Sequence, residues 1–439
     1  MLKSISAHAI RTKQQPTDHY LTRYLDRAGT VVFTVYVSIS AFGLYTCVYA
    51  LRKTFAAATF SDLHFAGIDY KIWLVTFQVC GYALSKFAGI KLIAEMAAKT
   101  RSKSIFAAVT IAWLSWLLFG FVDAPYNLIF LFINGLVLGL VWGMVFGFLE
   151  GRKVTEILGA ALSISFIFSS GLCRTVGGYM LRYFPEKWMP FASACLFFVP
   201  LLLFLFMLDK APRPTKSDEL ERTRRRPMNK IERRKFILYF LPGIILFVVA
   251  YTMLTAFRDF RDNFSAEVWM SLGYGNSPAI YTKTEVPVTL GVLVMMGAMM
   301  FVKNNKLAFM ANHVMIMTGM MLIGISTFLF ESDLLTPTLW MTLTGLGLYL
   351  GYVPFNSVFF DRLLATFQYA GTVGFIMYVA DAFGYLGSVA VLFVKEFGNV
   401  QLSWLEFLIA VGYFISIAGT VLISGSLLYF HKKHNALVN

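Results

Sequence analysis

Four basic residues lie inside or at the deep edge of strongly apolar stretches: Arg52, Lys86, Arg174 and Arg258. A cation at the centre of a membrane-spanning helix costs roughly 2.5–3.5 kcal/mol, so such residues are rare and are usually functional. Asp381 is the one comparably deep acid that the sequence reveals. The remaining surplus of about three positive charges predicts a buried site that binds an anion.

The first of these cations follows two tyrosines at helical spacing. Tyr45, Tyr49 and Arg52 recur at i, i+4 and i+7, so they share one face of a helix. An arginine presents a planar fork that suits phosphate or carboxylate, and tyrosine hydroxyls donate further hydrogen bonds. The alternative is that Arg52 and Lys53 mark the outer end of a membrane span.

Two further cations lie deeper in the first half of the chain. Lys86 is sixteen residues beyond the start of an apolar stretch at Tyr70, a depth from which a lysine reaches either surface with difficulty. Arg174 is flanked by Gly171, Gly177 and other small residues, which permit close approach of a second helix. Both residues are therefore expected to face the interior and bind the substrate.

The second half contributes one cation and one acid. Arg258 and Arg261 lie on one helix face, and each precedes an aspartate, so the alternative for Arg261 is a salt-bridged helix end. Asp381 is either a proton carrier or a pairing partner of a cation. Lys53 and Arg261 are the other candidates for coupling or charge pairing.

Enzyme and metal signatures are missing from the sequence. It contains no H-E-x-x-H, G-x-S-x-G or Walker pattern, so no catalytic residue, metal site or cofactor is expected. The four cysteines lie in apolar stretches without C-x-x-C spacing, and they are expected to be buried thiols.

These residues must be positioned by membrane helices. Of the 439 residues 58% are apolar and 14% are charged, which is typical of a multi-pass membrane protein. The net charge of +14 does not indicate nucleic acid, because 11 of the 38 basic residues lie between Lys210 and Lys235. Basic loops of this kind face the cytoplasm, so both termini are expected there, in a bacterial inner membrane. The expected partners are the lipid bilayer and a small anion, and the expected oligomeric state is a monomer.

A search for apolar windows of about 20 residues predicts an all-α membrane protein with about twelve spans. The first half comprises residues 28–208, with spans at 30–58, 70–94, 103–122, 126–149, 156–181 and 187–208. The second half comprises residues 236–430, with spans at 236–260, 280–302, 307–330, 336–359, 367–394 and 403–430. A cytoplasmic tail (1–27), a basic linker (209–235) and a second tail (431–439) complete the chain. Two six-helix halves around a substrate site are the major facilitator arrangement.

Glycines recur every fourth residue along the fourth predicted span, at Gly135, Gly139, Gly143 and Gly147. This spacing places them on one helix face, where the missing side chains let a second backbone approach. The pattern predicts tight packing of this span.

Short runs in three spans carry a family resemblance. The first span contains Arg52-Lys53-Thr54-Phe55, the second Ser85-Lys86-Phe87, and the eleventh Phe383-Gly384-Tyr385-Leu386-Gly387. These runs resemble the organophosphate:phosphate antiporters of the major facilitator superfamily. The resemblance implies that Arg52 and Arg258 bind an anionic group from opposite halves, with Lys86 and Tyr45 as additional donors.

The sequence also departs from that family. Arg174 stands where glycerol-3-phosphate-type members carry a histidine, which implies a different specificity. Along nearly its full length the chain is more similar to an uncharacterised bacterial multi-pass family, labelled only as a domain of unknown function. The shared runs include Phe257–Phe264 and Tyr349–Asn356.

The expected function is therefore transport of a small organic anion, a phosphate ester, by alternating access, with exchange for inorganic phosphate left open. One alternative is an anion sensor or accessory membrane protein that binds the anion without moving it. Another is a proton-coupled carboxylate transporter in which Asp381 titrates.

Overall fold

The computed structural model describes residues 19–94, 96, 99–150, 152, 154–212, 230–299, 301–369, 373–397 and 402–438. The predicted tail up to residue 18 and the linker between 213 and 229 lie outside these ranges. Within them the chain is almost entirely helical, and each of the twelve predicted spans contains a long helix or helix pair.

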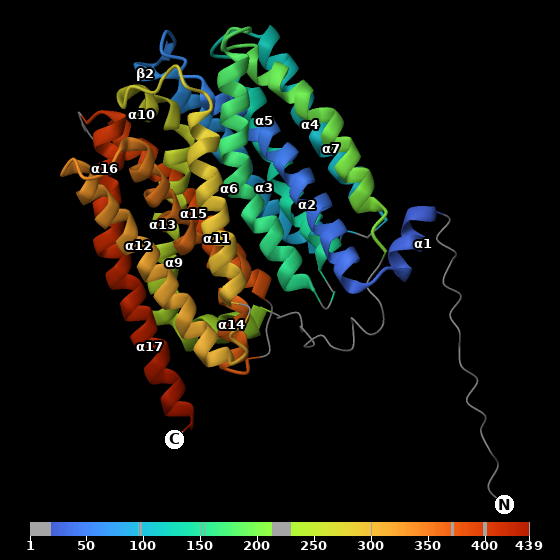
Figure 1. Cartoon of the computed structure of the whole chain (residues 1–439), viewed down its shortest axis with the longest axis vertical. Helices are drawn as coiled ribbons and strands as arrows, with labels where there is room; N and C mark the ends of the chain where they lie inside the picture. Colours follow the sequence, from blue (N-terminus) through green and yellow to red (C-terminus); the bar gives the residue numbers. More distant parts are fainter. Residues whose placement is uncertain are drawn as a thin grey trace, which may run out of the picture.

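The first half begins with the short helix α1 (Tyr20–Arg27) and then forms six long helices (Figure 1). These six are α2 (Thr30–Lys53), α3 (Tyr70–Ala94), α4 (Arg101–Phe121), α5 (Leu128–Leu149), α6 (Thr155–Met180) and α7 (Met189–Asp209). A 3₁₀ turn over Thr54–Ala57 continues α2, and the strands β1 (His64–Phe65) and β2 (Ile68–Asp69) follow. The two strands pair antiparallel, with Gly67 at φ 78° in their turn.

The second half contains nine helices among its described residues. They are α9 (Lys230–Asn263), α10 (Ser265–Ser271), α11 (Ile280–Met299), α12 (Asn305–Glu331), α13 (Pro337–Ser357), α14 (Phe359–Thr366), α15 (Val373–Phe397), α16 (Trp404–Phe414) and α17 (Thr420–Val438). A π-helical turn over Ile415–Gly419 joins α16 to α17, so the pair forms one long span. Helices α9 and α17 extend into the ranges predicted as linker and C-terminal tail.

Local signals explain where several helices begin and bend. The Ser403 hydroxyl accepts from the backbone N–H of Glu406, whose carboxylate accepts from the N–H of Ser403, so a capping box starts α16. Thr336 caps α13, and Pro337 occupies its first turn. Helices α13 and α14 meet at an angle of 53°, close to Pro354 near the end of α13.

Among the described residues, eight helical segments are long and apolar enough to cross a membrane, and the bent pair α13–α14 makes a ninth. The other three predicted spans correspond to α3, α11 and α15, which have 25, 20 and 25 residues. These helices carry charged residues such as Lys86, Glu285 and Asp381, which lower their mean hydropathy. They therefore fall short of the apolar criterion although they belong to the same bundle.

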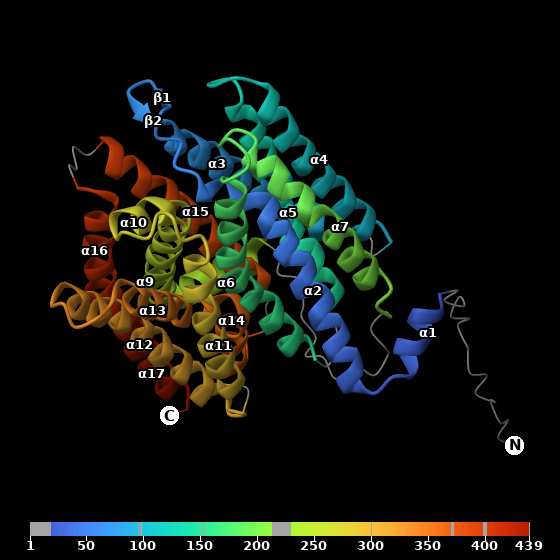
Figure 2. The same ribbon diagram turned by 45° about the horizontal axis from the view of Figure 1, so that its top comes forward.

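The two halves stand side by side, with α2–α7 in blue to green and α9–α17 in yellow to red (Figure 2). Helix α6 packs against α11, and α3 packs against α15, so both pairs connect the halves. The start of α2 and the end of α17 lie at one end of the molecule, whereas α10 and the β hairpin lie at the other (Figure 1). We call the latter the α10 end.

Candidate functional site

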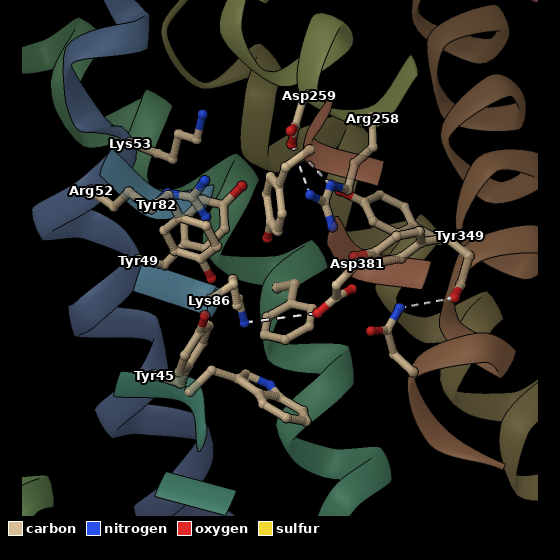
Figure 3. A pocket seen from close by; sticks show the side chains of 15 residues that line it. Tyr45, Tyr49, Arg52, Lys53, Tyr82, Lys86, Arg258, Asp259, Tyr349 and Asp381 are labelled. Atoms are coloured by element: carbon tan, nitrogen blue, oxygen red, sulfur yellow. Dashed lines mark hydrogen bonds and ion pairs between the residues drawn. The ribbon is translucent and has the colours of Figure 1, made fainter. Parts of the chain in front are cut away.

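A cavity lies between the two halves, and the empty space between its lining residues, open solvent included, is about 540 Å³. Its wall is made by α2, α3, α5 and α6 of the first half and by α9, α13 and α15 of the second (Figure 3). The charged residues on the wall are Arg52, Lys53, Lys86, Arg258, Asp259 and Asp381. We call this space the central cavity.

Arg52 is the cation on this wall whose guanidinium lacks a full set of partners. Its side chain is buried with 7% exposed, and neither Nε nor Nη2 has a hydrogen-bond partner. The guanidinium carbon lies 3.7 Å from the ring centroid of Tyr82, so the positive charge rests on an aromatic face. Unmatched buried donors carry a full desolvation cost, which an anion in the cavity would remove.

The other cations of the wall have partners within the protein. Arg258 Nη2 lies 2.8 Å from the carboxylate of Asp259. Lys86 Nζ lies 3.8 Å from the carboxylate of Asp381 on α15. Lys53 Nζ donates to the side-chain carbonyl of Asn263 at 2.6 Å.

The two carboxylates are held in place by hydroxyl donors. The Tyr251 hydroxyl donates to Asp381 at 2.5 Å, and the Ser388 hydroxyl donates to Asp259 at 2.8 Å. With four basic and two acidic side chains, the wall of the central cavity has a formal excess of two positive charges.

The backbone that carries Arg52 is itself fixed by polar side chains of three neighbouring helices. Gln78 donates its amide to the carbonyl of Arg52 at 2.8 Å. The Trp116 indole and the Asn134 amide both donate to the carbonyl of Leu51, at 2.5 and 3.1 Å. These donors satisfy carbonyls at the end of α2, where the helical hydrogen bonds run out.

A second group of charges lies on the α10 side of the central cavity. Arg174 pairs with Asp262 at 3.3 Å and lies 3.9 Å from Glu285, and Arg261 pairs with Glu285 at 2.7 Å. All four side chains are buried. We call them the buried charge cluster. Its two arginines and two acids balance, so it adds nothing to the excess charge of the cavity.

This cluster joins the halves, because Arg174 lies on α6 whereas Asp262 and Glu285 lie on α9 and α11. The Tyr49 hydroxyl on α2 also donates to Asp262, at 2.8 Å. Tyr49 therefore lines the central cavity and contacts the cluster at the same time.

The expectation that Asp381 is the one deep acid was wrong. Asp259, Asp262 and Glu285 are 4%, 3% and 3% exposed. The reason is that α9 continues to Asn263 and α10 follows directly, so the run from Arg258 to Asn263 lies inside the protein rather than at an exposed helix end. The excess of positive charge is consequently two on the cavity wall rather than three.

The structure also separates the predicted site residues. Tyr45, Tyr49, Arg52, Lys53, Lys86, Arg258 and Asp381 line the central cavity. Arg174 and Arg261 are not among the lining residues, and both belong to the buried charge cluster. Of the cysteines expected to be buried, Cys80 and Cys195 are exposed, because they lie on outward helix faces.

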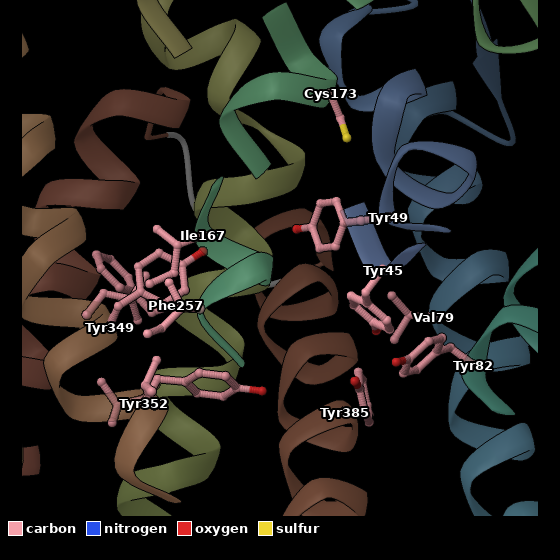
Figure 4. Packing of buried hydrophobic residues seen from close by; sticks show 14 of the residues in the cluster. Tyr45, Tyr49, Val79, Tyr82, Ile167, Cys173, Phe257, Tyr349, Tyr352 and Tyr385 are labelled. Atoms are coloured by element: carbon pink, nitrogen blue, oxygen red, sulfur yellow. The ribbon is translucent and has the colours of Figure 1, made fainter. Parts of the chain in front are cut away.

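Sequence reasoning missed most of the aromatic wall. Tyr82, Tyr349, Tyr352 and Tyr385 line the cavity, and tyrosines of the two halves face each other across it (Figure 4). Helical spacing could have indicated them: Tyr82 is four residues before Lys86, and Tyr385 is four residues after Asp381. Lys71, which is buried and pairs with Glu267 at 2.6 Å, was also missed.

A family model described as a family of unknown function, DUF5690, matches residues 54–433. The chain belongs to the DUF5690 family. The match covers the helices from α3 onwards and the cavity residues from Tyr82 to Tyr385, whereas the cavity residues of α2 precede it. No curated protein matches this DUF5690 chain in sequence.

Solved structures show which fold this DUF5690 protein has. A bacterial homologue of the human drug peptide transporters PepT1 and PepT2 is similar with a TM-score of 0.60 and 13% identity, over 93% of this chain and 100% of that one. A D-xylose–proton symporter is similar with a TM-score of 0.60 and 14% identity, over 89% of this chain and 97% of that one. The DUF5690 protein is thus an all-α multi-pass membrane protein with the major facilitator fold.

Proposed function

We propose that this DUF5690 protein is a transporter that moves a small organic anion, a phosphate ester, across the membrane by alternating access. The observation that carries the proposal is Arg52, a buried cation on the cavity wall with two guanidinium nitrogens that lack partners. Placing such a group in a membrane interior is costly, and an anion that accepts its hydrogen bonds would offset the cost.

The charge of the cavity wall supports a doubly charged substrate. The wall has an excess of two positive charges. A phosphate monoester carries a charge of roughly −1.5 to −2 at pH 7, so it would neutralise the excess, whereas a monocarboxylate would leave about one charge unmatched. Arginine forks on opposite sides, Arg52 on α2 and Arg258 on α9, also suit the several oxygens of a phosphate.

The fold supports movement of the bound anion. In transporters built from two related halves, the substrate site lies between the halves near the middle of the bilayer, and rocking of the halves exposes it alternately to each side. The central cavity lies between the halves here. This step rests on analogy of fold, and the resemblance of the first two spans to organophosphate:phosphate antiporters supports it further. The proposal places both termini in the cytoplasm, in a bacterial inner membrane.

Uptake into proteoliposomes tests the proposal. Purified protein should take up a radiolabelled phosphate ester saturably, and Arg52→Gln should abolish uptake while the variant still inserts and purifies. Arg23→Gln serves as the matched control, because Arg23 lies on the exposed face of α1, away from the cavity. Loading the vesicles with inorganic phosphate separates exchange from net uptake.

Two results would contradict the proposal. If the Arg52→Gln variant takes up the phosphate ester as the wild type does, Arg52 does not bind the transported anion. Saturable binding without any flux would favour an anion sensor or accessory protein over a transporter, because binding alone can shift an equilibrium between two conformations.

A further inference from the structure

The composition of the central cavity indicates more than a charge. Of its fifteen lining residues eight are aromatic, six are charged, and one is the amide Asn356. No serine, threonine, glutamine, histidine or aliphatic residue lines the cavity among the described parts of the chain. A ligand in this space therefore meets either charge or aromatic ring.

The two arginines and the ring of Tyr45 lie at different ends of the cavity. In Figure 3 Arg52, Lys53, Arg258 and Asp259 lie at one end and Tyr45 at the other, with Lys86 and Asp381 between them. Tyr45 packs against Phe166 with 5.0 Å between ring centroids. The cavity thus has one end at which cations lie among the rings and an opposite end with the Tyr45 and Phe166 rings.

Cations already cover some of the aromatic faces. Arg52 lies over Tyr82, and Arg258 lies over Tyr352 at 4.4 Å from the ring centroid. Tyr45, Phe166 and Trp142 carry no arginine, and Lys86 Nζ lies 5.7 Å from the Trp142 ring. These three rings are the surfaces against which the organic part of a ligand would pack.

Two donors of the wall have no partner. The Tyr349 hydroxyl is buried, with 1% of the residue exposed, and it makes no hydrogen bond. The Trp142 indole nitrogen is likewise buried without a partner. Buried donors are normally matched, so the Tyr349 hydroxyl is consistent with a ligand that supplies an acceptor, whereas the Trp142 side chain offers its ring face.

A polyol fits this wall poorly. Each buried hydroxyl of a sugar or glycerol unit requires a partner, and beside Phe166 the rings of Tyr45 and Trp142 offer only one hydroxyl and one indole nitrogen. An aromatic ring requires none and gains from packing against other rings.

We propose that the substrate is a dianion attached to an aromatic ring, of the aryl phosphate class, with its phosphate at Arg52 and its ring at Tyr45, Trp142 and Phe166. This inference rests on the proposed function, since it assigns the organic part of the same anion.

Dissociation constants for four probes test the inference by calorimetry on the purified full-length protein: inorganic phosphate, glycerol 3-phosphate, glucose 6-phosphate and phenyl phosphate. Stacking of a ring on aromatic side chains corresponds to a gain of about tenfold in affinity. Phenyl phosphate should therefore bind about tenfold more tightly than the two polyol phosphates, which carry the same charge.

Two variants locate the effect. Trp142→Leu and Phe166→Leu should each weaken phenyl phosphate several-fold and weaken inorganic phosphate less, so the preference for phenyl phosphate over inorganic phosphate, expressed as the ratio of their affinities, falls. Trp73→Leu is the matched control, because Trp73 lies outside the central cavity beside a separate groove. Its ratio should equal that of the wild type. The ratio is insensitive to the fraction of folded protein, and the wild-type probe series decides the question if a variant fails to fold.

The outcomes separate this inference from the proposed function. Arg52-dependent binding of phosphate, with a polyol phosphate equal to or tighter than phenyl phosphate, overturns the aromatic assignment and leaves the proposed function standing. Binding that is unchanged in Arg52→Gln, or the absence of binding for all four anions, overturns both the aromatic assignment and the proposed function.

Discussion

The central cavity contains basic side chains that would bind the proposed anion. It also contains acidic side chains that neutralise some of these basic groups. Asp259 and Asp381 lie against Arg258 and Lys86, so each acid occupies a cation that the substrate could use. Arg52 lacks such a counter-ion among the described residues. The site is therefore a set of cations of which some are already partly neutralised by the protein.

The pairing of Asp381 with Lys86 leads to a prediction at this scale. Asp381→Asn keeps the shape and removes a negative charge that competes with the substrate for Lys86, so anion affinity should rise about fivefold, which is about 1 kcal/mol. Calorimetry with phenyl phosphate or inorganic phosphate measures it. Asp123→Asn is the control, because Asp123 lies in an exposed loop and pairs with Lys187 at 2.6 Å.

The competing role of Asp381 as a proton carrier predicts a different result. In that case Asp381→Asn would abolish the pH dependence of uptake without a gain in affinity. That outcome would reject the counter-ion role and restore proton coupling.

At the residue scale the spacing of Tyr45, Tyr49 and Arg52 was sufficient to place them on one face, and the structure finds all three on the cavity wall. The partners of the charges could not be predicted. Asp262, the partner of Arg174, lies 88 residues away in sequence, and helical periodicity carries no information about such distant contacts. The sequence therefore indicated an anion site, but it could not show which cations are already neutralised.

Among the elements, the end of α2 depends on its neighbours for its hydrogen bonds. Trp116→Phe removes the indole donor to the carbonyl of Leu51 and keeps the ring that packs against Phe55. The Asn134 amide still reaches this carbonyl, so the expected loss of stability is about 1 kcal/mol. Anion binding should weaken as well, because Arg52 lies in the same turn.

A neighbouring tryptophan of α4 provides the matched control. The Trp113 indole nitrogen is buried without a partner, so Trp113→Phe removes no hydrogen bond and should leave the melting temperature and the anion affinity unchanged. Melting curves with and without phosphate measure both effects. Equal results for the two variants would show that the donor at Trp116 does not position α2.

Tight packing of α5 was predicted from its glycines and is confirmed, and the structure identifies α3 as the helix that packs there. A Cβ at Gly135 would collide with the carbonyl oxygen of Gln78, and one at Gly139 would collide with Ser85. The helix boundaries of α9 and α17 and the bend between α13 and α14 were predicted less well, because such extensions and bends depend on contacts beyond the local sequence.

This close approach makes Gly135→Ala a test of the interface. The added methyl group meets backbone, so α3 must move, and the expected loss of stability is about 1–3 kcal/mol or more. Gly297→Ala is the control, since a Cβ there meets nothing within 4 Å, and alanine should stabilise the helix by about 0.5–1 kcal/mol. Thermal melting of both variants provides the comparison. A Gly135→Ala protein as stable as the wild type would contradict the packing.

For the molecule as a whole, the basic linker and the twelve apolar spans were sufficient to predict two six-helix halves. They could not predict how the halves meet, because that contact joins residues distant in sequence, through packing of α6 on α11 and α3 on α15 and through buried charge pairs. The buried charge cluster and Tyr49 join α2 and α6 to α9 and α11 on the α10 side of the central cavity. We infer that these contacts keep the two halves together at this end.

Asp262 is the centre of this connection and the subject of the last prediction. Its carboxylate accepts hydrogen bonds from Tyr49 at 2.8 Å and Ser170 at 3.0 Å, and it pairs with Arg174 at 3.3 Å. Asp262→Asn preserves the shape but leaves the buried Arg174 with only the longer contact to Glu285 within the cluster. Removal of one partner of a buried ion pair costs about 3–5 kcal/mol, and separation of the halves at the α10 end would let water hydrate the arginine.

Spin labels on the two halves measure this separation. Phe121 at the end of α4 and Ser332 after α12 are exposed at the α10 end, and each is replaced by cysteine in a background without the four native cysteines. The distance between the labels should shift to longer values in Asp262→Asn and remain at the wild-type value in Asp123→Asn. A folded Asp262→Asn protein with an unchanged distance would show that the cluster does not hold the halves together.

Because Tyr49 belongs to both the cavity wall and the cluster, addition of phosphate should alter the distance in the wild type and have less effect in Asp262→Asn.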